Sequence, residues 1–318
     1  MVRGEKIRNA TRSKPCEICG GTGCGQTSNR IFCFRVEAGA EARSGKTGAW
    51  IHRREGAEFA PVILRRFDAP IGDIERRHSV YSALLNELNL TKQHGEELSG
   101  SKRKLSRSTI FNRQFKSVPS RMVGDALAGQ LSGQFTLKGV PGFWRKDGRW
   151  CLRFAGLNGY YIPLRDLKGR VQGLEIRRMY GEPKYLLVSS DSLPDGASSG
   201  APHHFVGTIG NTITVTEGAL KAEVASEALR RKHESDFVCG LISVTTFGDD
   251  FGAWLKTQIP FLSTVRLAFD SDWQTNDKVQ KQMERFARSI HAAGLRLQIV
   301  VWESGAKGWD DELLRLEK

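Results

Sequence analysis

Acidic residues stand directly after two of the strands that the sequence predicts. Glu217 follows an expected strand over 213–216, and Asp270 and Asp272 follow another over 264–269. Because residues i and i+2 of an extended segment point to the same side, the two aspartates should converge. Carboxylates gathered at one sheet edge repel one another unless a divalent cation lies among them, and Mg²⁺ prefers carboxylate oxygens. The pattern therefore predicts a site for Mg²⁺.

Asp310 and Asp311 follow the last expected strand and complete the set of candidate magnesium ligands. Each acid also has a purely structural interpretation. The Asp270-Ser271-Asp272 segment could form a turn that caps the next helix, and Asp310 and Asp311 could cap the final helix, whose dipole favours negative charge. Their ordered occurrence at strand ends favours a functional site, because an open α/β sheet binds its ligands outside the carboxyl ends of its strands.

A second group of candidate metal ligands lies near the N-terminus. Thiols that cluster in a chain without a secretory signal are more typical of a metal site than of disulfides. The first two are three positions apart and are followed by glycines, so both sulfurs could reach one tetrahedral zinc ion. The spacing between the third and fourth cysteines is irregular, so His52 is an alternative fourth ligand. The alternative to a zinc site is a Gly-rich loop that contains reduced cysteines. The four thiols are Cys16, Cys19, Cys24 and Cys33.

The chain of 318 residues carries a formal net charge of +13, and that charge is unevenly distributed. Residues 1–120 contribute +10, residues 121–206 contribute +5 and residues 207–318 contribute −2. Such asymmetry is expected when one part of a protein holds a polyanion such as nucleic acid, although a solvated basic surface would give the same numbers. No apolar run approaches the ~18–20 residues that cross a membrane, and no signal peptide is evident. We therefore expect a soluble, cytoplasmic protein without a membrane partner.

Strands and helices are expected to alternate from residue 207 to the end of the chain. This alternation is typical of a parallel sheet with helices on both faces. The expected strands cover 213–216, 238–244, 264–269 and 295–301, and the expected helices cover 219–232, 278–293 and 310–316.

The earlier part of the chain has a different pattern. Two helices are expected over 74–89 and 106–115, with Ser108 as a candidate cap of the second, and they are joined by basic segments. Short strands are then expected over 150–154, 159–164, 171–178 and 183–188. The predicted organisation is a zinc-binding module over 1–60, a basic helical connector over 61–120, an α+β subdomain over 121–206 and an α/β domain over 207–318.

Several of these segments resemble a known family. Val-Thr-Glu-Gly-Ala-Leu-Lys-Ala at 215–222 and Leu-Ala-Phe-Asp-Ser-Asp at 267–272 resemble the TOPRIM fold of DnaG-type primases, topoisomerases and certain nucleases. The segments 161–177 and 184–190 are similar to the primase stretch that precedes TOPRIM. The resemblance covers roughly residues 135–318. It implies an α/β TOPRIM domain preceded by a mixed α+β primase subdomain and an N-terminal zinc-binding module.

The resemblance also implies a function and a set of roles. It implies a DNA primase that makes short RNA primers on single-stranded DNA from ribonucleoside triphosphates by metal-dependent nucleotidyl transfer. Glu217 would be the catalytic glutamate, and Asp270 and Asp272 would bind Mg²⁺ or Mn²⁺. Lys221 stands four residues after the glutamate, where replicative primases often carry an acid, and is a further catalytic candidate. The candidates for binding nucleotide and template are Arg177, Arg178 and Lys184.

The wider context follows from the same resemblance. Primase-like proteins of phages, plasmids and integrative elements often end in the Lys-Gly-x-Asp-Asp pattern seen at 307–311, which suggests replication of a mobile element. The sequence has no P-loop motif, so any replicative helicase would be a separate partner. Two other functions remain open: a TOPRIM nuclease that uses the same acids for hydrolysis, and a non-catalytic nucleic-acid-binding accessory protein of replication.

Overall fold

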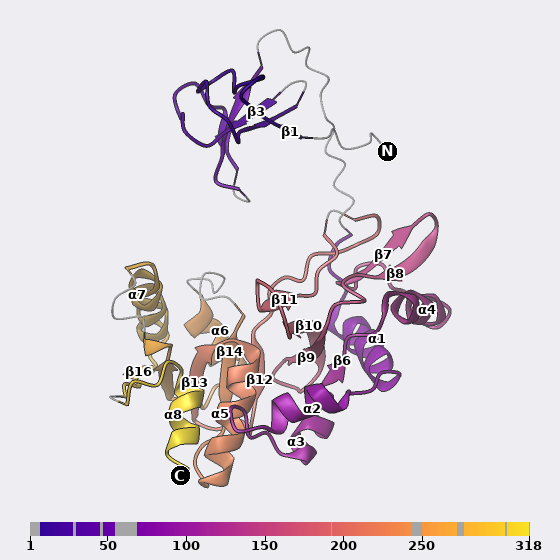
Figure 1. Ribbon diagram of the computed structural model, residues 1–318. Coiled ribbons are helices and arrows are strands. Elements are labelled where there is room, and N and C mark those ends of the chain that lie inside the picture. The colour runs from indigo at the N-terminus through magenta and orange to yellow at the C-terminus, as the bar shows by residue number, and fades with distance from the viewer. Residues whose placement is uncertain are drawn as a thin grey trace. The chain divides into compact units, whose positions relative to one another are not determined.

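The computed structural model divides the chain into two compact units, Met1–Arg65 and Arg66–Lys318 (Figure 1). Each unit has its own sheets and its own buried core. Within the described part of the chain, we find no helix whose length and apolar character would allow it to cross a membrane. The structure describes residues 7–27, 30–44, 47–54, 69–191, 193–242, 250–271, 277–302 and 304–317.

The first unit is built on one small antiparallel sheet in the order β1-β2-β3-β5-β4. Its strands are only two to four residues long, and its buried core consists of Ala10, Ile31 and three of the four clustered cysteines. A core of this size contributes little hydrophobic stabilisation, because small units bury little apolar surface. The strands are β1 Arg8–Asn9, β2 Gly25–Gln26, β3 Arg30–Cys33, β4 Ala42–Arg43 and β5 Trp50–Arg53.

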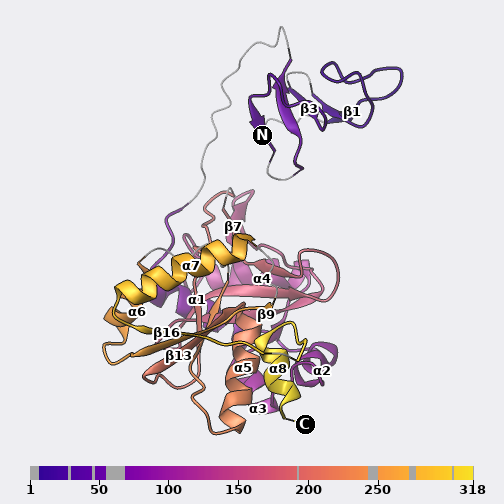
Figure 2. The same ribbon diagram turned by 90° about the vertical axis from the view of Figure 1, so that its left-hand side faces the viewer.

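The second unit contains a five-stranded sheet in the order β12-β14-β13-β15-β16. Its last four strands are parallel, and β12 pairs antiparallel at one edge. Helices α5 and α8 cover one face and α6 and α7 the other, as Figure 2 shows. The strands are β12 His204–Val206, β13 Thr212–Glu217, β14 Val238–Leu241, β15 Thr264–Ala268 and β16 Arg296–Ile299. The helices are α5 Ala219–Arg231, α6 Phe251–Gln258, α7 Asp277–Ala292 and α8 Trp309–Arg315.

An antiparallel sheet precedes this layer in the chain and has the order β11-β10-β9-β6. Helices α1 and α4 and the β7–β8 hairpin share one hydrophobic core with β9 and β10. The strands are β6 Lys116–Ser117, β7 Phe143–Lys146, β8 Arg149–Leu152, β9 Gly159–Arg165, β10 Val171–Arg178 and β11 Tyr185–Leu187. The helices of this part are α1 Ile74–Asn86, α2 Lys92–Ser99, α3 Arg107–Asn112 and α4 Arg121–Ser132.

Three helices lie where the sequence predicts none. Helix α2 has only His94 and Leu98 buried, and α4 contains two glycines, so neither carries a strong helical pattern. Helix α6 lies between two predicted strands. The predicted cap of α3 is wrong by two residues, because the hydroxyl of Ser106, and not Ser108, accepts the Thr109 backbone N–H at 3.1 Å.

A buried polar network fixes α5 relative to the antiparallel sheet. The Arg165 backbone N–H of β9 donates to His204 Nδ1 of β12 at 3.0 Å. His204 Nε2 lies 3.1 Å from a carboxylate oxygen of Glu223 in α5, and Glu223 also pairs with Arg113 at 3.2 Å. These contacts join α5 to β9 and β12, so they hold the start of α5 in position beside the antiparallel sheet.

Candidate active site

The turn between β13 and α5 places two side chains at the carboxyl edge of the parallel sheet. Gly218 adopts a φ of 79°, which other residues rarely tolerate, and its N–H donates to the Leu241 carbonyl of the neighbouring strand at 2.7 Å. Gly240 makes room for this turn, since a Cβ there would lie 2.6 Å from the Gly218 oxygen. Glu217 is therefore the last residue of β13, and Lys221 lies in the first turn of α5.

Lys221 forms an ion pair with Asp270, which lies two residues beyond the end of β15. Gly308 packs against this pair. A Cβ on Gly308 would lie 3.4 Å from both Lys221 Nζ and Asp270 Oδ1, and 2.4 Å from Asp310 Oδ1. The backbone N–H of Ser271 also donates to the Lys307 carbonyl at 2.9 Å, which ties the loop after β15 to the loop before α8. The glycine of the Lys-Gly-x-Asp-Asp segment thus lets the aspartates after β15 and in α8 approach each other.

Asp310 is the most buried acid of this group, with 1% of its surface exposed. Burial raises the pKa of its carboxyl, and the nearby Lys221 and Arg103 cations oppose that rise. Arg103 Nη1 lies 3.4 Å from Asp310 Oδ2, while Asp310 Oδ1 is buried and has no hydrogen-bond partner in the described structure. An orphaned carboxylate oxygen of this kind is a position where a cation would be favoured.

The donor set at this edge fits a hard divalent cation. Burial lowers the pKa of the Lys221 ammonium. Its hydrogen bond to Asp270 and its attraction to Glu217, Asp270 and Asp310 outweigh that effect, so the Lys221 pKa lies above its ordinary value. Carboxylate oxygens are the ligands that Mg²⁺ and Mn²⁺ prefer. Asp272 lies outside the described residues. The exposed Asp311 lines a separate surface hollow with Lys102 and Lys104, and its charge adds to the rise in the Asp310 pKa, so its predicted role as a metal ligand remains a prediction.

Replacing Lys221 by methionine should tighten Mn²⁺ binding by about tenfold or more. The ammonium competes with a metal ion for Asp270. Opposite charges about 4 Å apart attract by roughly 4 kcal/mol near a protein surface. A difference of about 1.4 kcal/mol already changes the dissociation constant tenfold. Titration calorimetry or the Mn²⁺ electron paramagnetic resonance signal measures the affinity. The matched control is Lys168→Met at an exposed turn. Unchanged or weaker Mn²⁺ binding by Lys221→Met would show that the ammonium does not compete for the acids.

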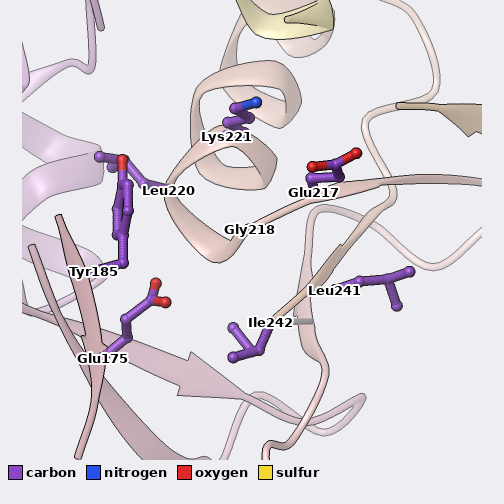
Figure 3. Close-up of a pocket in the computed structure, with 8 residues that line it drawn as sticks. All are labelled: Glu175, Tyr185, Glu217, Gly218, Leu220, Lys221, Leu241 and Ile242. Atoms are coloured by element: carbon purple, nitrogen blue, oxygen red, sulfur yellow. The ribbon is translucent and has the colours of Figure 1, made fainter. Parts of the chain in front are cut away.

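A cavity of about 330 Å³ opens beside the acids (Figure 3). Glu217, Gly218 and Lys221 line one side, and Glu175 and Tyr185 of the antiparallel sheet line the other. The remaining lining is apolar and comes from Leu220, Leu241 and Ile242. Glu175 is only 5% exposed, and its Oε2 has no hydrogen-bond partner in the described structure. Burial raises the pKa of Glu175 to about 7.

Glu175 should destabilise the folded protein above neutral pH. Burial raises its pKa in the folded protein from the usual 4.5 to about 7. Between pH 4.5 and 7 the carboxyl ionises in the unfolded chain but stays protonated in the folded one, so the folded state loses stability over this range and loses no more above it. We expect Glu175→Gln to increase the free energy of unfolding by about 2 to 3 kcal/mol at pH 8 and by little near pH 4.5. Denaturant unfolding of both proteins across this range measures the difference. A difference that does not change with pH would contradict the raised pKa.

Two of the candidate residues for nucleotide and template binding, Arg177 and Arg178, end β10, and the third, Lys184, directly precedes β11. The Arg177 guanidinium lies over the Tyr185 ring, 5.2 Å from its centroid, and donates to the Arg178 carbonyl. Arg178 donates to the carbonyls of Glu182 at 2.8 Å and Pro183 at 3.3 Å, while Lys184 is exposed. The structure brings Arg177 to the wall residue Tyr185, and it uses Arg178 to hold the β10–β11 connection. Their predicted contacts with phosphates remain predictions.

The predicted cysteine cluster of the first unit is confirmed. The four Sγ atoms of Cys16, Cys19, Cys24 and Cys33 lie within 4.8 Å of one another. The Cys19 and Cys24 sulfurs are 3.7 Å apart, far beyond a disulfide bond and close to the ~3.8 Å between ligands of a zinc ion with Zn–S bonds of about 2.3 Å. His52 is buried elsewhere, with Nε2 2.8 Å from the Val36 carbonyl, so it is not the fourth ligand.

Electrostatics at the cysteine cluster favour a bound cation. The Arg35 guanidinium, with help from the Gly21 backbone, lowers the pKa of the Cys19 thiol to about 6. Burial raises the pKa of Cys24 to about 12. Four adjacent sulfurs cannot all be thiolates without a compensating charge, and a zinc ion supplies that charge by replacing the protons. The donor set of four sulfurs therefore fits structural zinc.

Sequence reasoning missed two residues that shape the edge of the sheet, Arg103 and Glu175, and it noted Gly308 only as part of the Lys-Gly-x-Asp-Asp pattern. Arg103 binds Asp310 across 207 positions of sequence and also pairs with Glu97 at 3.8 Å, so no local pattern could reveal it. Glu175 had a detectable signal, because it is a single acid between Leu174 and Ile176 in a strand that is otherwise largely buried.

Solved structures share this fold. No family profile and no curated protein matches the sequence. The zinc-binding and RNA polymerase domains of the Aquifex aeolicus primase match with a TM-score of 0.55 and 16% identity, over 77% of this chain and 59% of that chain. This chain thus spans about three fifths of the length of that primase structure.

Two further structures agree with this match. The RNA polymerase domain of Mycobacterium tuberculosis primase DnaG matches with a TM-score of 0.56 and 16% identity, over 77% of this chain and 83% of that one. A DnaG primase catalytic domain bound to single-stranded DNA matches with a TM-score of 0.55 and 16% identity, over 76% and 75%. The chain therefore has the fold of the DnaG primase catalytic core.

Proposed function

We propose that this chain is a DNA primase that synthesises short RNA primers on single-stranded DNA by metal-dependent nucleotidyl transfer. The observation that carries the proposal is the gathering of Glu217, Asp270 and Asp310 at the carboxyl edge of the parallel sheet, within the fold of primase catalytic cores. We assign that sheet and its helices to the TOPRIM fold. One matched primase domain was solved with single-stranded DNA, which supports the same kind of template for this chain.

The roles follow from the positions of the side chains. Glu217, Asp270 and Asp310 would hold Mg²⁺ or Mn²⁺, with Asp272 as a further predicted ligand. A metal ion held there would supply charge stabilisation for the triphosphate and would lower the pKa of the attacking 3′-hydroxyl. Lys221 orients Asp270 through their ion pair, and Arg103 orients Asp310.

Basic residues would serve the nucleic acid and the incoming nucleotide. Lys184 is exposed next to the wall residue Tyr185, where an ammonium can reach phosphates of nucleotide or template. The zinc-binding unit would hold the template strand, since its surface carries several arginines. The resemblance to primase-like proteins of phages, plasmids and integrative elements supports a role in replication of a mobile element, with a separate helicase as a candidate partner.

Primer synthesis tests this proposal directly. The full chain is incubated with single-stranded DNA, four ribonucleoside triphosphates and Mg²⁺ or Mn²⁺, and the products are separated on a sequencing gel. We expect short RNA oligomers that require the DNA, the nucleotides and the metal together. Cleavage of plasmid DNA without nucleotides, in the absence of primers, would identify a nuclease instead. DNA binding with neither activity would identify an accessory protein.

A further inference from the structure

The cavity beside the acids lies where the sugar of a bound nucleotide is expected. Glu217 and Lys221 belong to the group of charged residues at the sheet edge and line one side of the cavity, and Glu175 lines the other. In the proposed function the triphosphate lies at the acids, and the sugar is the next group along a nucleotide. The cavity volume of about 330 Å³ is at the small end of ligand pockets. The cavity therefore suits one part of a nucleotide rather than the whole molecule.

Templated synthesis decides which part of the nucleotide the protein can hold. The edge of each base that carries its hydrogen-bonding groups must pair with the DNA template, so that edge is not open to a protein side chain. The sugar is the same in all four ribonucleotides. A contact between the protein and the sugar therefore leaves base pairing free.

Glu175 is the polar group that this cavity presents without a partner. The residue is only 5% exposed, and its Oε2 has no hydrogen-bond partner in the described structure. Figure 3 shows the carboxyl group directed from β10 toward the cavity. The backbone that carries it is fixed, because Glu175 is paired with Ile162 of β9 on one side and with Leu187 of β11 on the other. A buried acceptor in a fixed position is satisfied by a ligand that brings an O–H or N–H donor to it.

A ribose brings such a donor in its 2′-hydroxyl. Carboxylates are proven acceptors for this group, since an acidic side chain accepts from the ribose 2′-hydroxyl in dinucleotide-binding folds. A deoxyribose has no 2′-hydroxyl, so it would leave the buried carboxylate unpaired. The apolar part of the lining suits the carbon-bound hydrogens of a sugar and comes from Leu220, Leu241 and Ile242.

We propose that the Glu175 carboxylate accepts a hydrogen bond from the ribose 2′-hydroxyl of the incoming nucleotide and thereby selects ribonucleotides over deoxyribonucleotides. The inference rests on the proposed function and deepens it, because it names the residue that makes the product RNA. Tyr185 lines the cavity beside Glu175, and the Arg177 guanidinium lies over its ring. This cation–π contact holds the wall in place before a nucleotide binds.

Nucleotide binding to the full chain tests the proposal. Equilibrium dialysis at pH 8 with Mn²⁺ compares ATP, 2′-deoxy-ATP and 3′-deoxy-ATP, without DNA, so that primer synthesis does not consume the nucleotides. We expect ATP and 3′-deoxy-ATP to bind at least about tenfold more tightly than 2′-deoxy-ATP, because a site built around a hydroxyl rejects the analogue without it. CTP and 2′-deoxy-CTP should show the same preference, since the contact does not involve the base.

The variant Glu175→Leu removes the acceptor and keeps a side chain of similar size. Its preference for ATP over 2′-deoxy-ATP should fall below about threefold, through weaker binding of ATP alone. Denaturant unfolding at pH 8 shows that the variant is folded. Glu175→Gln, which keeps one acceptor oxygen, is the second variant, and its preference should lie between those of Glu175→Leu and the wild type. The matched control is Glu182→Leu, an exposed acid in the β10–β11 connection, which should keep the full preference.

The outcomes separate this inference from the proposed function. Equal binding of ATP and 2′-deoxy-ATP by the wild type, or a preference that is absent for CTP, would overturn the ribose contact and leave primer synthesis intact. Equally weakened binding of both nucleotides by Glu175→Leu would also overturn it, because the loss would then not concern the 2′-hydroxyl. A ribose preference that depends on Glu175, in a protein that makes no primers, would support the contact and overturn the primase proposal. Failure to bind any of the nucleotides would overturn the contact, while the gel assay decides primer synthesis independently.

Discussion

Replacing Asp270 by asparagine should lower the rate of primer synthesis by at least about 100-fold. Asp270 is central to the acid cluster. It pairs with Lys221 of α5, and it lies against Gly308, which also packs against Asp310 of α8. Asparagine keeps the shape of the side chain but removes the negative charge. It also leaves the Lys221 ammonium without its closest counter-ion, so the edge of the sheet becomes less negative and its affinity for divalent cations falls.

Two measurements check the Asp270 prediction. Primer synthesis reports the catalytic effect, and Mn²⁺ titration reports the loss of metal binding independently of catalysis. Asp147→Asn is the matched control, because this exposed residue lies in the β7–β8 turn with a φ of 50° that asparagine tolerates. Full primer synthesis by Asp270→Asn would show that this cluster is not the catalytic metal site. The double variant Asp270→Ala, Asp272→Ala extends the test to the second predicted aspartate.

The acids at the sheet edge could be predicted because their positions depend on local pattern. Glu217 ends one strand of mostly β-branched and apolar residues and Asp270 follows another. Parallel strands place their carboxyl ends at one edge of the sheet. The register confirms this geometry, since Thr216 pairs with Ala268 of the neighbouring strand. Most strands and helices of the parallel layer could be predicted for the same reason, because their apolar spacing is strong.

The rest of the site depends on contacts between distant segments. Residues 92–112 were expected in a basic connector, yet Leu98 and Ile110 share a hydrophobic core with Leu220 of α5. Those contacts place Arg103 against Asp310, and nothing in the local sequence of either residue specifies the pair. The partner of Lys221 could not be predicted from local sequence either. Its position in the sequence drew attention because replicative primases often carry an acid there, but only the fold shows that its ammonium pairs with Asp270.

The first unit has too small a hydrophobic core to be stable through apolar burial. Its core is small and three of its buried residues are thiols, so apolar burial alone cannot hold the five short strands together. The ligands come from the turn that contains Cys16 and Cys19, from Cys24 before β2 and from Cys33 at the end of β3. A metal ion that joins these segments would take the place of a larger core, and its binding free energy would be folding free energy.

Replacing Cys33 by serine should therefore remove zinc and unfold the first unit. Structural zinc sites of this kind contribute about 10 kcal/mol or more of binding free energy, which exceeds what the small core can supply. Elemental analysis should find one zinc ion per chain in the wild type and much less in Cys33→Ser, and proteases should then cleave within 7–54 while the second unit stays intact. Cys151→Ser, in β8 of the second unit, is the matched control and should keep its zinc. A Cys33→Ser protein that retained one zinc ion and a protease-resistant first unit would refute the four-sulfur site.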